Sequence, residues 1–108
     1  EIPWGPARYG TQSKVLFKDN EAKQALMMVK ADPGAVLSDH EHTGLELTYV
    51  IEGSLEDDHG KCTAGNFVWR PKGSRHQARC PEGAVFLVLF NGGARSVETG
   101  EVFPNFDE

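Results

Sequence analysis

Two histidines and a glutamate share one short segment of the chain, and a third histidine follows further along. His40 and His42 are two residues apart, so on a β-strand both imidazoles would point to the same face. Glu46 continues this parity, although Gly44 could interrupt the strand. Imidazole nitrogens and carboxylate oxygens are the usual ligands of Zn, Fe, Mn, Ni and Cu ions. The spacing therefore indicates a metal site, which His76 could join from across a barrel.

Each histidine, taken alone, is weak evidence for a metal. Asp39 and Glu41 make the His-x-His segment acidic, and such histidines are often solvated loop residues. A single histidine such as His76, which follows the turn-forming residues 71–74, is more often a turn residue than a ligand. His59 lies in the predicted hairpin 57–60 and is interpreted as an exposed turn histidine. The case for a metal site therefore depends on His40, His42, Glu46 and His76 occurring together.

Glycines spread along most of the chain separate short stretches rich in Val, Leu, Phe and Tyr, and this punctuation predicts an all-β domain. Residues 20–30 could be read as a helix, but they end at the turn 32–34, so we predict a strand there too. The clearest predicted strands are 13–17, 24–30, 45–51, 66–70 and 84–90. Weaker candidates are 35–42, 54–58, 76–80 and 96–103.

Two of these strands indicate how the layers are arranged. In 45–51, the face that carries Glu46, Thr48 and Val50 lies opposite a strongly apolar row. Residues 84–90 are apolar on both faces, so both faces need a cover. One cover is the core of the domain, and the other is a second sheet, the N-terminal segment or a partner subunit. We expect a homodimer.

Composition narrows the class of protein. With 108 residues, 39% of them hydrophobic, the chain fits one domain (1–108) that can form a core. The net charge of −5 and the lack of a Lys/Arg cluster argue against nucleic acid, and no apolar run is long enough to span a membrane. Cys62 and Cys80 form no CxxC and are read as free thiols in a reducing cytoplasm. Residues 1–12 are predicted to form a packing arm anchored by Trp4, and 104–108 a frayed tail.

The segments around the histidines resemble the two sequence motifs of the cupin superfamily. The first motif, G-x5-H-x-H-x3-E-x6-G, matches residues 34–53 at every specified position: Gly34, His40, His42, Glu46 and Gly53. The second, G-x5-P-x-G-x2-H-x3-N, matches residues 65–80 at Gly65, Pro71, Gly73 and His76, with Cys80 where the motif expects Asn. Nine of the ten specified positions agree.

This resemblance implies a double-stranded antiparallel β-helix, the RmlC-like jelly-roll barrel of cupins. It also implies that His40, His42, Glu46 and His76 bind one divalent metal ion in the barrel mouth. Cys80 stands at a position that is not usually a ligand, and it would place a thiol near the site. We expect Fe(II) in the active form, with Zn, Ni or Mn possible in isolated protein because affinities follow the Irving–Williams order.

A finer similarity links residues 47–60, 64–67 and 71–76 to small ChrR-like cupins. That group includes C-terminal domains of zinc-binding anti-sigma factors and lies near acetylacetone-cleaving dioxygenases. The similarity implies an oxygenase that cleaves a C–C bond in a small-molecule substrate, a diketone or hydroxyketone, with Glu46 either bound to the metal or released to act as a base. Two alternatives remain: a metal- or ligand-sensing domain of the anti-sigma type, and a scaffold with a closed metal site.

Candidate substrate residues follow from position alone, and ordinary core packing is the alternative for all of them. The candidates are Met27 or Met28, Thr48, Val50, Phe67 or Trp69, and Phe86 or Val88. Arg70, Arg75 and Arg79 flank His76, and one of them could clamp a carboxylate. Such arginines more often pair with surface acids.

Overall fold

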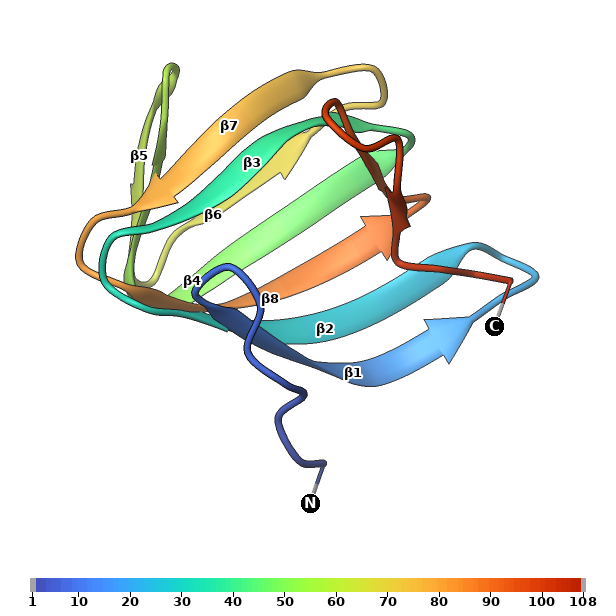
Figure 1. Cartoon of the computed structure of the whole chain (residues 1–108), viewed down its shortest axis with the longest axis horizontal. Coiled ribbons are helices and arrows are strands. Elements are labelled where there is room, and N and C mark those ends of the chain that lie inside the picture. Colours follow the sequence, from blue (N-terminus) through green and yellow to red (C-terminus); the bar gives the residue numbers. More distant parts are fainter. Residues whose placement is uncertain (1, 108) are drawn as a thin grey trace.

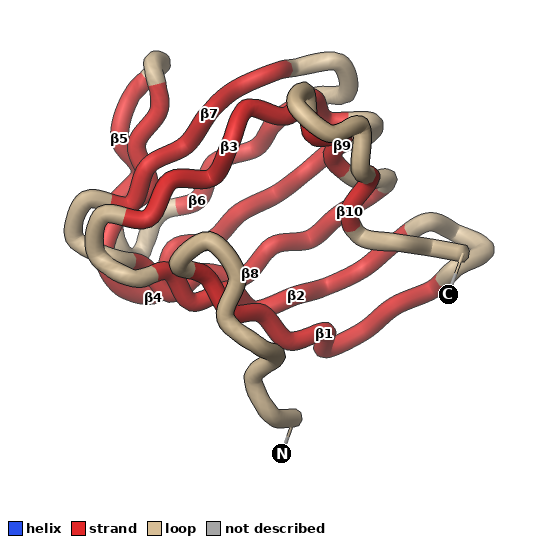
Figure 2. The backbone as a smooth tube through the Cα atoms, in the orientation of Figure 1, coloured by secondary structure: helices blue, strands red, loops and turns tan. Residues whose placement is uncertain are grey.

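The computed structural model describes residues 2–107, apart from the side chain of Ser38, and in this range the chain is all-β without any helix. The strands curl into an antiparallel barrel (Figures 1 and 2). They are β1 (Thr11–Asp19), β2 (Gln24–Ala31), β3 (Ala35–His42), β4 (Leu45–Asp57), β5 (Gly60–Thr63), β6 (Phe67–Arg70), β7 (Arg75–Cys80), β8 (Ala84–Asn91), β9 (Ala94–Ser96) and β10 (Val102–Phe103). Within residues 2–107 no helix has the length and apolar character that a membrane span requires. The all-β prediction is confirmed.

Strand β4 connects the two sides of the barrel. Its first part pairs with β8 and β6, and its last part pairs with β5 and, through Glu56 and Arg79, with β7. The sequence predicted separate strands at 45–51 and 54–58, but the structure has one strand of 13 residues. A register shift between Val50 and Glu52, followed by Gly53 at a φ of 73°, lets the strand turn without ending. Glu46 and Asp57 therefore lie near opposite ends of the same strand.

Three other expectations about the elements need correction. Strand β5 was not predicted, because its sequence GKCT carries no apolar pattern. Residues 96–103 do not form one strand; β9 and β10 are two short strands that pair with each other. Residues 104–107 of the predicted tail are not frayed, since Pro104 is buried and Phe106 packs against the core.

The N-terminal segment that precedes β1 lies beside that strand. The Gly5 N–H donates to the Ser13 carbonyl over 2.8 Å. The ammonium groups of Lys14 and Lys30 stand over the Trp4 ring, 4.5 and 4.8 Å from its centroid. These contacts anchor the arm through Trp4, partly by cation–π attraction.

The alternation of side chains decides which residues face the barrel interior. The buried core includes Met27, Val50, Cys80, Phe86 and Val88. In register, Phe67 lies opposite Tyr49 and Trp69 opposite Leu47, on the face away from Thr48 and Val50. Phe67 is 67% exposed and Trp69 is 57% exposed. The prediction that Phe67 or Trp69 lines the interior is therefore wrong, because β6 presents its aromatic side chains outward.

The bend in β4 requires a glycine at position 53. Substituting Gly53 therefore tests this description of the fold. A Cβ at Gly53 would lie 1.9 Å from the Gly83 carbonyl oxygen, and φ is positive there. Gly65 also has a positive φ, but a Cβ would meet nothing within 4 Å. In thermal or urea unfolding, Gly65→Ala should cost only the left-handed backbone penalty of about 1–2 kcal/mol. Gly53→Ala should cost clearly more, and equal losses would contradict this account of the bend.

Candidate metal centre

Three histidines from two neighbouring strands converge inside the barrel. His40 and His42 come from β3, and His76 comes from β7, where it lies opposite His40 in the antiparallel register. The register shifts between Leu37 and His40, so a bulge directly precedes the histidine pair. One ring nitrogen from each histidine lies within 4.8 Å of the others, and the ring centroids are 4.6 to 5.0 Å apart. The three side chains could hold a metal ion.

The hydrogen-bond partners of His42 settle where its proton sits. Its Nδ1 lies 3.2 Å from the Ser74 carbonyl oxygen and 3.0 Å from Ser74 Oγ. The Ser74 hydroxyl itself donates to the Pro71 carbonyl over 2.7 Å, so Oγ can only accept from the imidazole. Nδ1 therefore carries the proton in this arrangement. In the neutral ring, Nε2 is left with a free lone pair, which is the form that binds metals.

The Glu46 carboxylate faces that lone pair. Glu46 Oε2 lies 3.0 Å from His42 Nε2, while Oε1 accepts a hydrogen bond from Thr48 Oγ1 over 3.1 Å. His42 Nε2 is buried and has no hydrogen bond of acceptable geometry to any of residues 2–107. Burial alone would raise the pKa of the Glu46 carboxyl, but the contacts with His42 and Thr48 outweigh it and hold that pKa below its ordinary value. A proton or a metal ion at His42 Nε2 would satisfy both of these buried atoms.

This arrangement fits a bound cation. The 3.0 Å between His42 Nε2 and Glu46 Oε2 is short enough for one cation to contact both atoms. A cation between them would also remove the repulsion between an unprotonated nitrogen and a carboxylate. Three imidazoles, with a carboxylate beside one of them, suit several divalent ions of the first transition row.

His76 is held by a residue that sequence reasoning missed. Its Nδ1 lies 3.1 Å from Asp57 Oδ2, and its side chain is 11% exposed. Burial, followed by the neighbouring His40, lowers the pKa of His76 to about 4, so the ring is neutral at pH 7, as a metal ligand must be. Asp57 is followed by Asp58 in the same acidic turn, and no sequence signal separates the two.

The remaining predicted site residues lie outside the cluster. Arg75 pairs with Asp39 over 2.8 Å and Arg79 with Asp58 over 3.8 Å, in the manner of surface ion pairs. Arg70 pairs with the buried Asp57. The His59 side chain is exposed, as interpreted from the sequence.

The expectation that Cys80 places a thiol near the metal site is wrong. Cys80 is fully buried in the hydrophobic core, four residues beyond His76 on β7, which is about 13 Å along an extended strand. Burial raises the pKa of the Cys80 thiol to about 11, so it packs as a small apolar side chain.

Solved structures of similar fold include an enzyme, a candidate enzyme and an anti-sigma complex. A candidate acetylacetone dioxygenase from Methylibium petroleiphilum PM1 shares 18% identity and a TM-score of 0.84, covering 94% of this chain and 80% of the other. An acetylacetone dioxygenase from Acinetobacter johnsonii also shares 18% identity, with a TM-score of 0.81 and coverage of 93% and 76%. The complex of Rhodobacter sphaeroides SigE with the anti-sigma ChrR shares 21% identity and a TM-score of 0.74, covering 83% of this chain and 49% of the other. At these identities the comparisons establish the cupin fold.

A comparison with curated proteins found no significant match. The model of the ChrR cupin-like domain matches residues 1–95, which is most of the chain. Together with the barrel and its histidine cluster, this match shows that the chain belongs to the ChrR cupin-like family.

Proposed function

We propose that the chain is a metal-dependent dioxygenase that cleaves a C–C bond in a small diketone or hydroxyketone. Its ligands are His40, His42, His76 and Glu46, around one divalent ion, with Fe(II) as the working metal. The observation that carries the proposal is the buried His42 Nε2, which faces the Glu46 carboxylate at 3.0 Å and has no hydrogen bond of acceptable geometry to any of residues 2–107. The fold similarity to acetylacetone dioxygenases supports the reaction class.

The residues around this site hold the ligand side chains in position and exclude water from the barrel interior. A bound Fe(II) would orient the reactants and polarise a substrate oxygen as a Lewis acid. Ser74 fixes the His42 ring, and Thr48 fixes one oxygen of Glu46 so that the other stays turned toward His42. If Glu46 left the metal, its carboxylate would be a buried base beside the substrate. Met27, Val50, Phe86 and Val88 are buried in the interior and exclude water from it.

Removing one ligand should abolish metal binding without unfolding the barrel. His42→Ala deletes the buried Nε2, whereas His59→Ala deletes an exposed imidazole and serves as the control. We expect the wild type and His59→Ala to bind one metal per chain by elemental analysis, and His42→Ala to bind none stoichiometrically. Circular dichroism should show the strand spectrum in all three. Full metal occupancy in His42→Ala would contradict the ligand assignment.

Catalysis can be tested through oxygen consumption. The apo-protein is loaded with Fe(II) under anaerobic conditions, β-dicarbonyl compounds such as acetylacetone are added, and oxygen uptake is followed. Uptake should depend on Fe(II) and on the diketone, and should be lost in His42→Ala. If no metal supports uptake with any diketone or hydroxyketone, the oxygenase proposal fails.

A second candidate is a sensing domain, favoured by the family's relation to ChrR. This chain covers 49% of the matched chain in the SigE–ChrR complex, so the rest of such a regulator would have to come from sequence outside these 108 residues. Absorption spectra of the Co(II)-loaded protein separate the two functions. A closed tetrahedral spectrum favours a non-catalytic domain, and a five- or six-coordinate spectrum favours the enzyme.

The two free cysteines suit a reducing compartment, so we propose that the protein is located in the cytoplasm.

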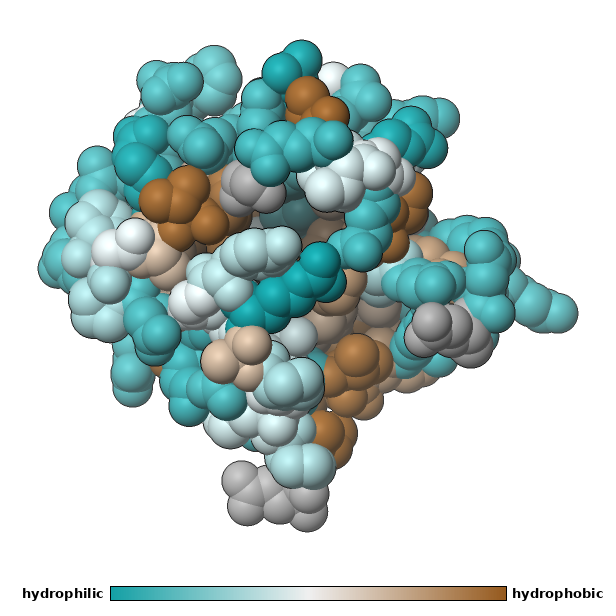
Figure 3. All heavy atoms as spheres, viewed as in Figure 1, coloured by the Kyte–Doolittle hydropathy of each residue, from teal (hydrophilic) through white to brown (hydrophobic). Residues whose placement is uncertain are grey.

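We further propose that the chain forms a homodimer through the outer face of the sheet made by β1, β2, β8, β4 and β6. Two adjacent rows cross these strands in register: Trp69–Leu47–Leu89–Leu26–Phe17 and Phe67–Tyr49–Leu87–Met28–Lys14. Within the described strands these two rows contain no carboxylate, although the chain carries a net charge of −5. The face of the molecule seen in Figure 3 is, by contrast, mostly hydrophilic.

A second copy is the occupant that these two rows suit best. Two acidic chains can meet there without bringing carboxylates together. The four exposed aromatic side chains of these rows and their aliphatic neighbours on both copies would bury on the order of 1,000 Å², the lower bound for a specific interface. The dimer would also cover the second apolar face of β8, as the sequence pattern requires.

A charge placed in these rows should separate the copies. Trp69→Glu puts a carboxylate at a position that is 57% exposed, and Val36→Glu puts one on β3, at a site 45% exposed and outside the rows. Light scattering coupled to size exclusion should show a dimer for the wild type and Val36→Glu, and a monomer for Trp69→Glu. A monomeric wild type at micromolar concentration, or a dimeric Trp69→Glu, would contradict this interface.

A further inference from the structure

Asp57 is a buried carboxylate whose two oxygens are both occupied by donors. Its side chain is 3% exposed, whereas that of its neighbour Asp58 is 94% exposed. Oδ1 accepts the backbone N–H of His59 over 2.8 Å. Oδ2 faces His76 Nδ1 at 3.1 Å and pairs with the Arg70 guanidinium. Asp57 is therefore held from three directions, and one of its partners is a histidine of the candidate metal site.

The proton between Asp57 and His76 can sit only on the histidine. The carboxylate is ionised beside Arg70, so it offers only acceptors. Nδ1 of a neutral His76 must then be the N–H donor, and the lone pair is left on Nε2. This repeats the arrangement at His42, where the acceptors are the two oxygens of Ser74. Both histidines are thereby set in the same tautomer by groups that do not themselves reach the metal cluster.

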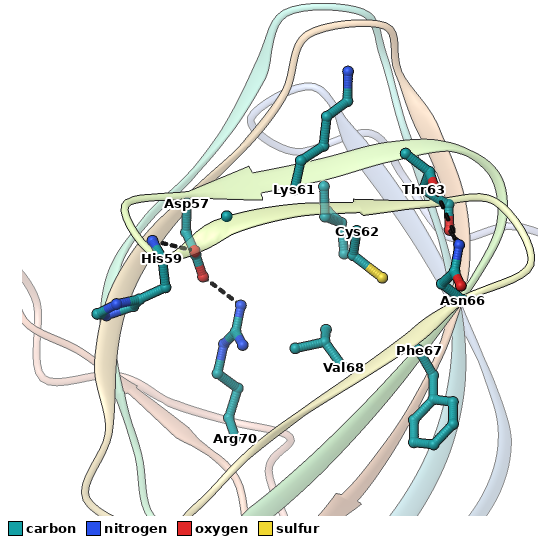
Figure 4. Close-up of a pocket in the computed structure, with 11 residues that line it drawn as sticks. Asp57, His59, Lys61, Cys62, Thr63, Asn66, Phe67, Val68 and Arg70 are labelled. Atoms are coloured by element: carbon teal, nitrogen blue, oxygen red, sulfur yellow. Dashed lines mark hydrogen bonds and ion pairs between the residues drawn. The ribbon is translucent and has the colours of Figure 1, made fainter.

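The path of β4 and the position of Arg70 explain why Asp57 stays in place. Arg70 lies opposite Glu46 in the β4–β6 register, and its guanidinium extends to the far end of β4 to meet Asp57. Asp57 and Arg70 line a cavity of about 490 Å³ between the β4–β5 hairpin and β6 (Figure 4). His76 does not line that cavity. Arg70 therefore neutralises the Asp57 carboxylate on the side that borders the cavity. The carboxylate can still accept a hydrogen bond from His76 on its other side.

We propose that Asp57 is a positioning residue of the metal site, which orients the His76 ring and presents its Nε2 to the metal, and that Arg70 holds the Asp57 carboxylate for this task. A carboxylate on the far nitrogen of a metal-binding histidine fixes the ring and raises its basicity. The inference rests on the proposed metal site, but it concerns the protein and its metal affinity and does not depend on which reaction is catalysed.

The tautomer of His76 in the metal-free protein is a direct test. Long-range ¹H–¹⁵N correlation spectra of chelator-treated wild-type protein at pH 7 distinguish Nδ1–H from Nε2–H, and a His76→Gln sample assigns the signals. We expect His76 with its proton on Nδ1. An Nε2–H signal for His76 would overturn the proposal. This measurement needs no variant of Asp57, so it decides the matter even if such variants do not fold.

Metal affinity gives the second test, with a matched pair of neighbouring aspartates. Asp57→Ala should weaken Co(II) and Zn(II) binding about 10- to 100-fold in competition with a chromophoric chelator, the usual cost of losing such a partner. Asp58→Ala, at an exposed carboxylate, should leave affinity unchanged. A folded Asp57→Ala protein that binds Co(II) as tightly as the wild type would overturn the proposal. A wild-type protein that binds Co(II) but shows no oxygen uptake with any diketone or hydroxyketone would count against the proposed reaction and not against this role of Asp57.

Discussion

The structure is organised around a buried contact between His42 Nε2 and Glu46 Oε2, which lie 3.0 Å apart. Burying a lone-pair nitrogen beside a carboxylate without a proton or a cation between them would be costly, because neither atom can be solvated. A proton or a metal ion relieves that cost, and the nearby nitrogens of His40 and His76 favour a metal because they add two further ligands. Metal binding and stability of the folded state should therefore be linked, since the unfolded chain holds no preformed site.

Strand β4 reverses the usual arrangement of polar and apolar side chains. Its inner face carries Glu46, Thr48 and Val50, while its outer face carries exposed apolar residues such as Leu45 and Tyr49. The barrel interior must accommodate a carboxylate and three imidazoles, so it cannot be wholly apolar. The outer face of the same sheet is apolar instead. The proposed homodimer and the proposed metal site are in this sense two consequences of one alternating pattern.

The sequence predicted the three histidines of the candidate site but not Asp57, which contacts one of them. The two-residue spacing of His40 and His42 places both on one face of a strand, because strand parity is a local property. The resemblance to the cupin motifs then added His76 to the pair, and the structure brings the three together. Asp57 could not be found in the same way. Only the continuation of β4 through Gly53 turns Asp57 inward and leaves Asp58 exposed.

The errors in the sequence reading have the same origin. Whether Phe67 and Trp69 face the interior depends on the pairing of β6 with β4, a contact between segments that local pattern does not specify. The two apolar faces of residues 84–90 could be read from sequence, but which face lies inside could not. The core-packed tail was missed because the burial of Phe106 is a tertiary contact of a short segment without periodicity.

Every proposed ligand lies on a strand and not in a loop, and this restricts what the site can do. Glu46 belongs to the part of β4 that is paired with β8 on one side and β6 on the other, and His40 is paired with both β7 and β9. Ligands on paired strands are held more rigidly than ligands on loops, so the metal would meet a site that is already formed. A preformed site of four ligands suits catalysis at the remaining coordination positions, because the protein need not reorganise when substrate binds. A sensor needs the opposite property, a conformational difference between its metal-bound and metal-free states. The pairing of β3, β4 and β7 is therefore a physical argument for the proposed enzyme over the sensing domain.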